Sequence, residues 1–374
     1  MERKNFIQNY KRIVIKCGSA VVTDNNGKLD LEVISHIAKD IAKYLGKNFK
    51  ITLVTSGAVA CGVGVFGREP KHLREKQAFS SVGQILLMES YKKAFQKYKI
   101  QIAQILLTHE DFKNRKRFVH IKENIETLLN LNVLPIVNEN DSIVVNEIKF
   151  GDNDKLSALY AGLFDADLLM LLTDIDGFYD ANPKCSDNCN LITSVKKIDE
   201  NIFKLAESTK SRLGTGGMMS KLKAADKATN LGIPVIIANG KTDGIIEKVL
   251  SGENYGTFFY PKKKRMRSKK FWILYSVKSR GELIIDNGAV KAILEKGKSL
   301  LPVGILDIKG KFEEGDVVKC LNKKGDFLAK GITFYSSEDI SKIKQQDSSK
   351  IKDILGYKYA DEVINRDNLV IVKK

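Results

Sequence analysis

Apolar and polar positions follow one repeated pattern over the first 260 residues. A short apolar run is followed by a turn rich in Gly, Ser, Asn or Asp, and then by a longer stretch with the apolar spacing of a helix. This order predicts an α/β fold in which helices sandwich a mainly parallel sheet. Each run is almost continuously apolar, which is typical of strands that helices cover on both faces. The predicted strands are residues 13–15, 51–54, 102–107, 133–137, 168–172 and 234–237.

The pattern changes in the last part of the chain, where glycines separate short apolar segments. This predicts a small strand-rich domain with one helix near residues 288–296. The length of 374 residues also exceeds the roughly 250–300 residues that one core usually supports. We therefore predict a first domain over residues 1–260, a linker over 261–276 and a second domain over 277–374.

Positive charge is concentrated towards the end of the chain. The net charge is +17, and residues 261–374 hold 26 Lys and Arg against 15 Asp and Glu. The basic residues of the predicted linker are Lys262, Lys263, Lys264, Arg265, Arg267, Lys269 and Lys270. The cluster fits a solvated linker and also fits contact with an acidic partner such as RNA, so RNA binding stays open.

The sequence argues against membrane and secreted proteins. No apolar stretch approaches the roughly 18–20 residues of a membrane span, and residues 1–5 lack the layout of a secretory signal. The five cysteines are scattered and odd in number, which predicts no disulfide framework and a cytoplasmic location. Cys185 and Cys189 are close, but no second Cys or His pair is near, so no zinc site is expected.

Candidate site residues follow the predicted strands, because ligands of parallel sheets bind outside the carboxyl ends of the strands. The first strand leads to Lys16, an ammonium suited to a phosphate. Ser56 follows the second strand in a turn of small residues. Acids and amides gather over residues 138–141 and 151–154. Asp152 could cap the following helix, but the whole group indicates a site for a polar substrate, a metal or cations.

Two further segments suit a nucleotide. The fifth strand ends in Thr173 and Asp174, which could form a turn or hold a sugar or base. A glycine-rich run at residues 214–221 precedes an amphipathic stretch at residues 222–230, and glycines at a helix start leave amide hydrogens free to bind an anion. By contrast, the G-x-G-x-x-G motif at residues 62–67 begins eight residues after a predicted strand and lacks the expected acid, so no dinucleotide site is expected there. P-loop and protein-kinase signatures are absent from the sequence.

Together these segments make the chain resemble the glutamate 5-kinase family, amino acid kinases that open proline biosynthesis. The segments are residues 14–19 (VIKCGS), 54–58 (VTSGA), 136–141 (IVNEND), 151–158 (GDNDKLSA), 171–174 (LLTD) and 214–218 (GTGGM). Residues 299–304 (SLLPVG) and 354–357 (ILGY) resemble a PUA domain, a fold otherwise known in RNA-modifying enzymes. The resemblance covers most of the chain and implies an amino acid kinase fold followed by a PUA-like domain.

The resemblance also implies roles for individual residues. The residues implied for catalysis are Lys16, Asp154 and Lys221. The two lysines would lie beside the transferred phosphoryl group, and the aspartate would hold them in place. The residues implied for binding L-glutamate are Ser56, Asn138, Asp141 and Asn153. The residues implied for binding ATP are Lys16, Thr173, Asp174, Thr215, Gly216, Gly217, Met218, Met219, Ser220 and Lys221. Mg²⁺ would bind with ATP, held mainly by its oxygens and with no metal ligand assigned to the protein.

Some alternatives stay open. Met219 and Ser220 stand where the family more often has a small polar residue and a threonine, which bears on the fit of the nucleotide. A related kinase acting on acetylglutamate or a nucleoside monophosphate is the nearest competitor, although the intact residues 138–141 and 151–154 favour glutamate. An RNA-binding regulator with a kinase-like scaffold is a competitor of another class, and the intact lysines and aspartate argue against it. The resemblance further implies a homo-oligomer and L-proline as a feedback inhibitor.

Overall fold

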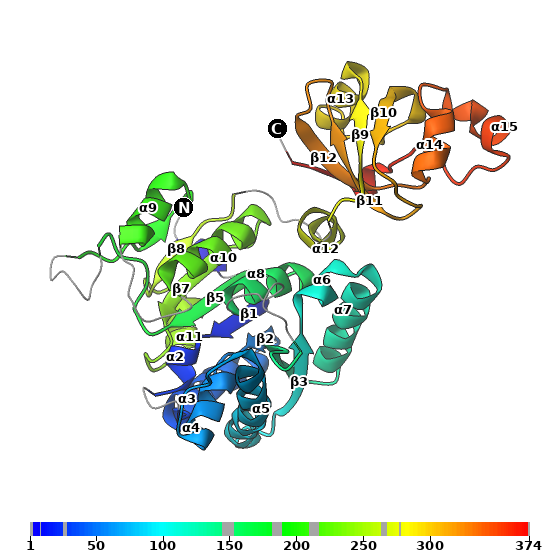
Figure 1. The fold of residues 1–374 in the computed structure, drawn as a ribbon. Coiled ribbons are helices and arrows are strands. Elements are labelled where there is room, and N and C mark those ends of the chain that lie inside the picture. Colours follow the sequence, from blue (N-terminus) through cyan, green and yellow to red (C-terminus); the bar gives the residue numbers. More distant parts are fainter. Residues whose placement is uncertain are drawn as a thin grey trace. The chain divides into compact units, whose positions relative to one another are not determined.

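The computed structural model describes residues 3–7, 9–24, 28–143, 153–181, 189–208, 217–262, 268–276 and 278–372. The chain forms two compact units, drawn in Figure 1. Unit 1 comprises Met1–Asp111 and Lys116–Met266, and unit 2 comprises Phe112–Arg115 and Arg267–Lys374. Among the described residues, no helix is both long enough and apolar enough to cross a membrane.

An eight-stranded sheet forms the centre of unit 1, in the order β3-β4-β2-β1-β5-β7-β8-β6. Its strands are β1 (Arg12–Cys17), β2 (Lys50–Val54), β3 (Gln101–Leu107), β4 (Val133–Glu139), β5 (Leu168–Thr173), β6 (Ser194–Val195), β7 (Val235–Asn239) and β8 (Thr257–Phe259). The six longer strands coincide with the six predicted runs and pair in parallel. β8 pairs antiparallel with β7, and β6 runs with β8. The predicted mainly parallel sheet is confirmed.

β3 differs from the prediction of strands covered on both faces. It lies at the edge of the sheet, and only Ile105 and Leu107 of its seven residues are buried. The cause is its place in the sheet, because an edge strand has a neighbour on one side only. Position at an edge is decided by the order of strands, and the apolar run of a single strand does not reveal it.

Helices cover both faces of this sheet (Figure 1). The helices of unit 1 are α1 (Arg3–Ile7), α2 (Ser19–Val22), α3 (Leu31–Leu45), α4 (Ala58–Phe66), α5 (Leu73–Gln96), α6 (His109–Lys113), α7 (Arg115–Asn130), α8 (Asn153–Leu163), α9 (Glu200–Ser208), α10 (Met218–Asn230) and α11 (Ile245–Leu250). α8 contacts β1 and β5, and α10 contacts α8 and β7. α3 contacts α5 and α11, and these three helices share a core with the sheet.

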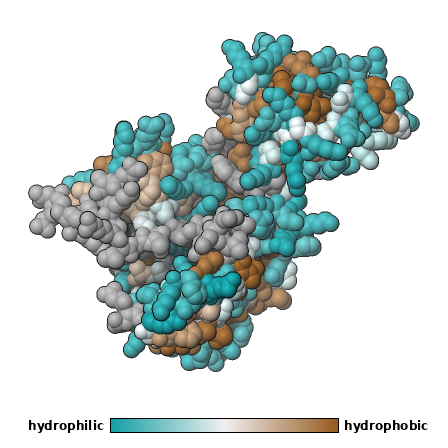
Figure 2. All heavy atoms as spheres, viewed as in Figure 1, coloured by the Kyte–Doolittle hydropathy of each residue, from teal (hydrophilic) through white to brown (hydrophobic). Residues whose placement is uncertain are grey.

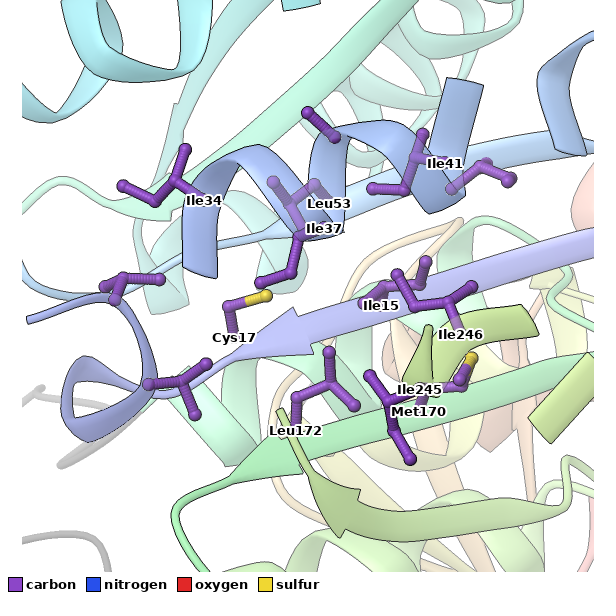
Figure 3. Packing of buried hydrophobic residues seen from close by; sticks show 14 of the residues in the cluster. Ile15, Cys17, Ile34, Ile37, Ile41, Leu53, Met170, Leu172, Ile245 and Ile246 are labelled. Carbon is purple, nitrogen blue, oxygen red and sulfur yellow. The ribbon is translucent and has the colours of Figure 1, made fainter. Parts of the chain in front are cut away.

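The alternation of side chains along β1 places its last lysine. Ile13, Ile15 and Cys17 join the core that includes α3 and α11, as Figure 3 shows for Ile15 and Cys17. Successive residues of a strand point to opposite faces. Lys16 therefore points to the other face, which α8 covers.

The first glycine of the G-x-G-x-x-G motif lies where two helices cross closely. Residues 62–66 of the motif lie inside α4, which follows β2 directly, and Gly67 ends the helix with a φ of 65°. A Cβ atom on Gly62 would lie 2.2 Å from the carbonyl oxygen of Phe79 in α5. A Cβ atom on Gly83 of α5 would lie 1.8 Å from the carbonyl oxygen of Ala58. The α4–α5 crossing is thus so close that it requires glycine on both helices.

Unit 2 is the predicted strand-rich domain. Its sheet has five strands in the order β10-β9-β11-β12-β13, and the predicted helix is present as α13. The prediction of one helix was too low, because α12, α14 and α15 are also present. Each of these has seven residues or fewer and so shows little periodicity in the sequence. The elements are α12 (Ser268–Phe271), η2 (Trp272–Ser276), β9 (Gly281–Ile285), α13 (Asn287–Leu294), η3 (Pro302–Gly304), β10 (Ile305–Lys309), β11 (Val317–Leu321), β12 (Phe327–Ile332), α14 (Ser337–Ile343), η4 (Ser348–Lys350), α15 (Ile351–Leu355), η5 (Arg366–Asn368) and β13 (Leu369–Ile371).

The end of the predicted linker is helical and belongs to unit 2. Phe271, Trp272 and Ile273 are buried, and η2 contacts β12 and β13. Three consecutive large apolar side chains would be costly in water, so they pack into the nearest core. Lys269 and Lys270 lie in α12, whereas residues 263–267 are outside the described residues.

Candidate active site

Two buried lysines share one buried carboxylate at the carboxyl end of β1. Lys16 Nζ lies 2.5 Å from Asp154 Oδ1, and Lys221 Nζ lies 3.2 Å from Asp154 Oδ2. The side chains of the lysines are 5% and 8% exposed, and that of Asp154 is fully buried. The three side chains come from β1, α8 and the first turn of α10. One negative charge faces two positive charges, so the group as a whole is cationic and suited to an anion.

The carboxylate of Asp154 is held in its ionised form. Burial by itself would raise its pKa, but Lys16 and Lys221 outweigh burial and lower the pKa to about 2. Ser220 adds a hydrogen bond from its Oγ to Asp154 Oδ2, at 2.6 Å. Ser220 was implied as an ATP residue, and in this structure its hydroxyl contacts Asp154. The group stays charged over the whole physiological range of pH.

The lowered pKa predicts how Asp154 contributes to stability with pH. A carboxylate with a lowered pKa stabilises the fold above its ordinary pKa, near 3.9, and that contribution is lost as the pH falls towards 2. We expect the unfolding free energy of the wild type to exceed that of Asp154→Asn at pH 6. The excess should shrink by about 2 kcal/mol between pH 4 and pH 2. Urea titrations of both proteins at each pH measure the two unfolding free energies. An excess that stays constant between pH 4 and pH 2 would contradict the ion pairs of Asp154.

Beside this cluster, amide side chains converge from three elements. Asn153 Nδ2, at the start of α8, donates to the backbone carbonyl of Thr55, to Ser56 Oγ at 3.0 Å and to Asn138 Oδ1 at 2.7 Å. Asn138 and Asn153 are buried, and Ser56 is partly exposed. The structure thus brings together three of the four residues implied for glutamate. Asp141 is the fourth, and it lies two residues beyond the end of β4.

α5 contributes side chains to this site that were not among the predicted residues. Ser80 Oγ donates to Asp141 Oδ2 at 3.0 Å, and Gln84 Oε1 accepts a hydrogen bond from Asn138 Nδ2 at 2.7 Å. Tyr91 shares a hydrogen bond of 2.9 Å with the hydroxyl of Thr55. Positions 80, 84 and 91 lie on one face of the helix. The sequence contained one indication of this role, since these polar residues recur at helical spacing on a face of α5 that is otherwise buried.

The residues implied for ATP lie on the other side of β1. Thr173 ends β5 and is buried, and its hydroxyl lies 3.1 Å from a carboxylate oxygen of the exposed Asp174. Gly217 precedes α10, no side chain caps the helix there, and a Cβ on Gly217 would meet no atom within 4 Å. Free amide hydrogens and open space suit a phosphate. Thr215 and Gly216 lie outside the described residues.

α10 begins earlier than the sequence predicted. The amphipathic stretch indicated a helix from residue 222, whereas α10 starts at Met218. Met218, Met219, Ser220 and Lys221 therefore form its first turn. Because a lysine at a helix N-terminus is unfavourable with respect to the helix dipole, Lys221 is placed there at a cost, which Asp154 offsets.

The order of the strands separates the two halves of the site. β2 and β4, which carry Ser56 and Asn138 at or beyond their ends, lie on one side of β1. β5, which ends in Thr173, lies on the other side of β1. Within the sheet, Lys16 pairs with Val54 of β2 and with Leu171 of β5. Lys16 thus stands at the boundary between the amide cluster and the nucleotide segments.

The described residues contain no group of three or more His, Cys, Asp or Glu side chains that could hold a metal ion. The oxygens of Asp154 already contact both lysines and Ser220.

Known families and solved structures resemble large parts of this chain. Residues 11–239 match the amino acid kinase family, and residues 281–355 match the PUA domain. Among solved structures, a UMP kinase from Bacillus anthracis matches with a TM-score of 0.47 and 13% identity, covering 68% of this chain and 97% of that chain. The family model spans most of unit 1, including both lysines and Asp154.

Full-length relatives narrow the family. A glutamate 5-kinase of Syntrophotalea carbinolica is 46% identical over 99% of this chain and 100% of its own length. A glutamate 5-kinase of Thermoanaerobacter sp. is 45% identical over 97% of this chain and 98% of its own. One from Carboxydothermus hydrogenoformans is 45% identical over 99% of this chain and 100% of its own. The chain therefore belongs to the amino acid kinase family and, within it, to the glutamate 5-kinases that carry a C-terminal PUA domain.

Proposed function

We propose that this chain transfers the γ-phosphoryl group of ATP to the γ-carboxylate of L-glutamate, giving ADP and L-glutamyl 5-phosphate, the first step of proline biosynthesis. The observation that carries the proposal is the pair of buried lysines on Asp154, placed between the amide cluster and the N-terminus of α10. The full-length relatives at about 45% identity support the same reaction.

The reaction needs alignment and charge neutralisation more than acid–base chemistry. The γ-carboxylate of glutamate is ionised at neutral pH, so its oxygen can attack the phosphorus directly. One P–O bond forms to the carboxylate while the bond to the β-phosphate oxygen breaks and ADP leaves. Charge on the transferred group is spread over its oxygens. Lys16 and Lys221 neutralise that charge, and Asp154 fixes their positions.

The substrates bind on either side of Lys16. Asp141 suits the α-ammonium of glutamate by charge, and the amides of Asn138 and Asn153, with the Ser56 hydroxyl, suit its carboxylates. ATP lies across Thr173, Asp174 and the residues from 215 to 221, with its phosphates at the N-terminus of α10. Mg²⁺ bound to ATP supplies further neutralisation of phosphate charge.

An assay of acceptor specificity tests this function. With ATP and Mg²⁺, L-glutamate should give ADP and an acyl phosphate that hydroxylamine traps, because the acid and amides of the site suit a free amino acid. Acetylglutamate, aspartate and UMP are the matched acceptors. Faster ADP release with acetylglutamate or UMP than with glutamate would assign the chain to another branch of the superfamily. Absence of turnover with every acceptor would favour a scaffold role.

We also propose that the chain forms a homo-oligomer through the crossing of α4 and α5. Large apolar side chains are exposed on these two helices, and Figure 2 shows apolar residues gathered on unit 1. The exposed side chains of the two helices are Val65, Phe66, Val82, Ile85 and Leu86. Exposed apolar side chains grouped on two helices that contact each other are typical of interaction sites, and most soluble oligomers are homo-oligomers.

The oligomer is tested by one substitution in this patch. Ile85 is 70% exposed, so Ile85→Asp should leave the fold intact and shift the protein to a smaller species in sedimentation experiments, because a buried charge at an interface is costly. Leu131→Asp, at an exposed leucine of unit 1 outside the patch, is the control and should change nothing. A wild type that sediments as a monomer at all concentrations would refute the proposal.

Further properties stay proposals. We place the kinase domain at residues 1–260 and the PUA-like domain at 277–374, and we assign α12 and η2 of the predicted linker 261–276 to the second domain, with which they pack. Every residue assigned to chemistry then precedes the linker. A cytoplasmic location fits the described cysteines Cys17, Cys61, Cys189 and Cys320, which are free. Inhibition by L-proline is tested by adding it to the glutamate assay. RNA binding by the PUA-like domain is tested by titration at increasing salt, since contacts to phosphates alone weaken steeply with salt.

A further inference from the structure

Gln84 of α5 is a buried amide beside the proposed glutamate site. Its side-chain oxygen accepts a hydrogen bond from Asn138 Nδ2, and Asn138 in turn accepts one from Asn153. The residue is only 9% exposed, and its Nε2 is buried with no hydrogen-bond partner among the residues that the structure describes. A buried amide donor without an acceptor is unfavourable, so the position calls for a specific role.

The orientation of the Gln84 amide follows from its neighbours. The backbone N–H of Glu139 donates to Asn138 at 2.8 Å, so the accepting atom of Asn138 is its oxygen. The other atom of that side chain is then the nitrogen, which must donate to Gln84. The atom of Gln84 that meets Asn138 is therefore oxygen, and its free atom is nitrogen with two hydrogens. The unpaired group of Gln84 is therefore a donor, even if the oxygen and nitrogen atoms of these amides were first placed the other way round.

α5 holds this donor in a fixed place. Gly83 contacts Ala58 so closely that no side chain fits between them, and Ala58 follows the Ser56–Gly57 turn of the same site. One turn earlier in α5, Ser80 holds Asp141. The helix therefore cannot slide or rotate without moving three other groups of the site. The Nε2 group of Gln84 is thus a fixed hydrogen-bond donor beside amides that suit carboxylates. A carboxylate of the substrate would supply the acceptor for this donor.

We propose that Gln84 is a specificity-determining residue for the acceptor. Its Oε1 fixes the amide of Asn138, and its Nε2 donates a hydrogen bond to a carboxylate oxygen of bound L-glutamate. This inference rests on the proposed function, since it assumes that Ser56, Asn138 and Asn153 line the glutamate site. It assigns the substrate a partner that the sequence did not indicate, because the residue lies in the middle of a long helix and away from every strand end.

Two substitutions separate the two ends of the side chain. Gln84→Glu keeps an oxygen to accept from Asn138 but replaces the donor by a second oxygen. Gln84→Met keeps the length of the side chain and removes both the acceptor oxygen and the donor nitrogen. We expect both variants to raise the KM for glutamate about tenfold or more, as expected for loss of a hydrogen bond to a charged group, while the KM for ATP changes less than twofold. Gln96→Glu, at an exposed glutamine of the same helix, is the matched control and should behave as the wild type.

A pH series gives a readout that a purely structural role would not move. The new carboxyl group of Gln84→Glu can donate a hydrogen bond when it is protonated, so its KM for glutamate should fall towards the wild-type value as the pH is lowered. Gln84→Met should show no such recovery. The inference would be overturned if Gln84→Glu had a wild-type KM for glutamate at neutral pH. It would also be overturned if the KM for ATP rose as much as the KM for glutamate. Failure of the wild type to phosphorylate glutamate would instead refute the proposed function.

Discussion

Replacing Lys16 or Lys221 with methionine should lower kcat by ~10²–10³-fold, the loss typical of removing one preorganised donor from a transition state. The expected KM values for ATP and glutamate change much less, because the charge is needed most when the phosphoryl group is in transit. Steady-state kinetics with each substrate varied in turn measures the effect. The fold should survive, because either substitution leaves Asp154 with one lysine as a balanced buried pair.

The control for these substitutions is Lys223→Met. Lys223 is exposed on the same helix as Lys221, so its loss removes the same charge without touching the site. It should keep wild-type kcat. Near-normal turnover of a folded Lys221→Met protein would remove this lysine from the mechanism and leave Lys16 as the main source of charge neutralisation.

The second large effect is expected at the α4–α5 crossing. Gly83→Ala would place a methyl group 1.8 Å from the backbone oxygen of Ala58, a contact that neither helix can relieve by a side-chain rotation. Overpacking usually costs about 1–3 kcal/mol, and a clash with backbone belongs at the upper end of that range. We expect a fall of about 3 kcal/mol in unfolding free energy, measured by urea titration, and a raised KM for glutamate because Gln84 and Ser80 move with α5.

Gly46→Ala is the matched control. Gly46 ends α3 with ordinary helical backbone angles, and a Cβ there would lie 3.6 Å from its nearest neighbour. The substitution should leave stability unchanged or slightly raised, by about 0.4–1 kcal/mol, because alanine has less freedom in the unfolded chain. If Gly83→Ala were as stable and active as Gly46→Ala, the two helices would have to be further apart than the structure places them.

The sequence determined much of the fold because the signals involved are local. Continuous apolar runs located all six long strands, and the glycine-separated segments located the second domain. The resemblance implied that Lys16, Asp154 and Lys221 act together, and in the structure the three side chains meet, as residues at strand ends and helix starts of a parallel sheet do. The strands β6 and β8 escaped prediction because two or three residues carry no periodicity.

Only the tertiary structure decided how these residues meet. The shared carboxylate of the two lysines depends on α8 and α10 lying on the same face of the sheet, at residues far apart in the chain. The purpose of Gly62 and the place of Gln84 beside Asn138 depend on the crossing of α4 over α5. A glycine or glutamine inside a helix has the same local pattern whether it faces water, another backbone or a substrate. What distinguishes these cases is the distance to atoms from other elements, and the chain sets that distance only when it folds.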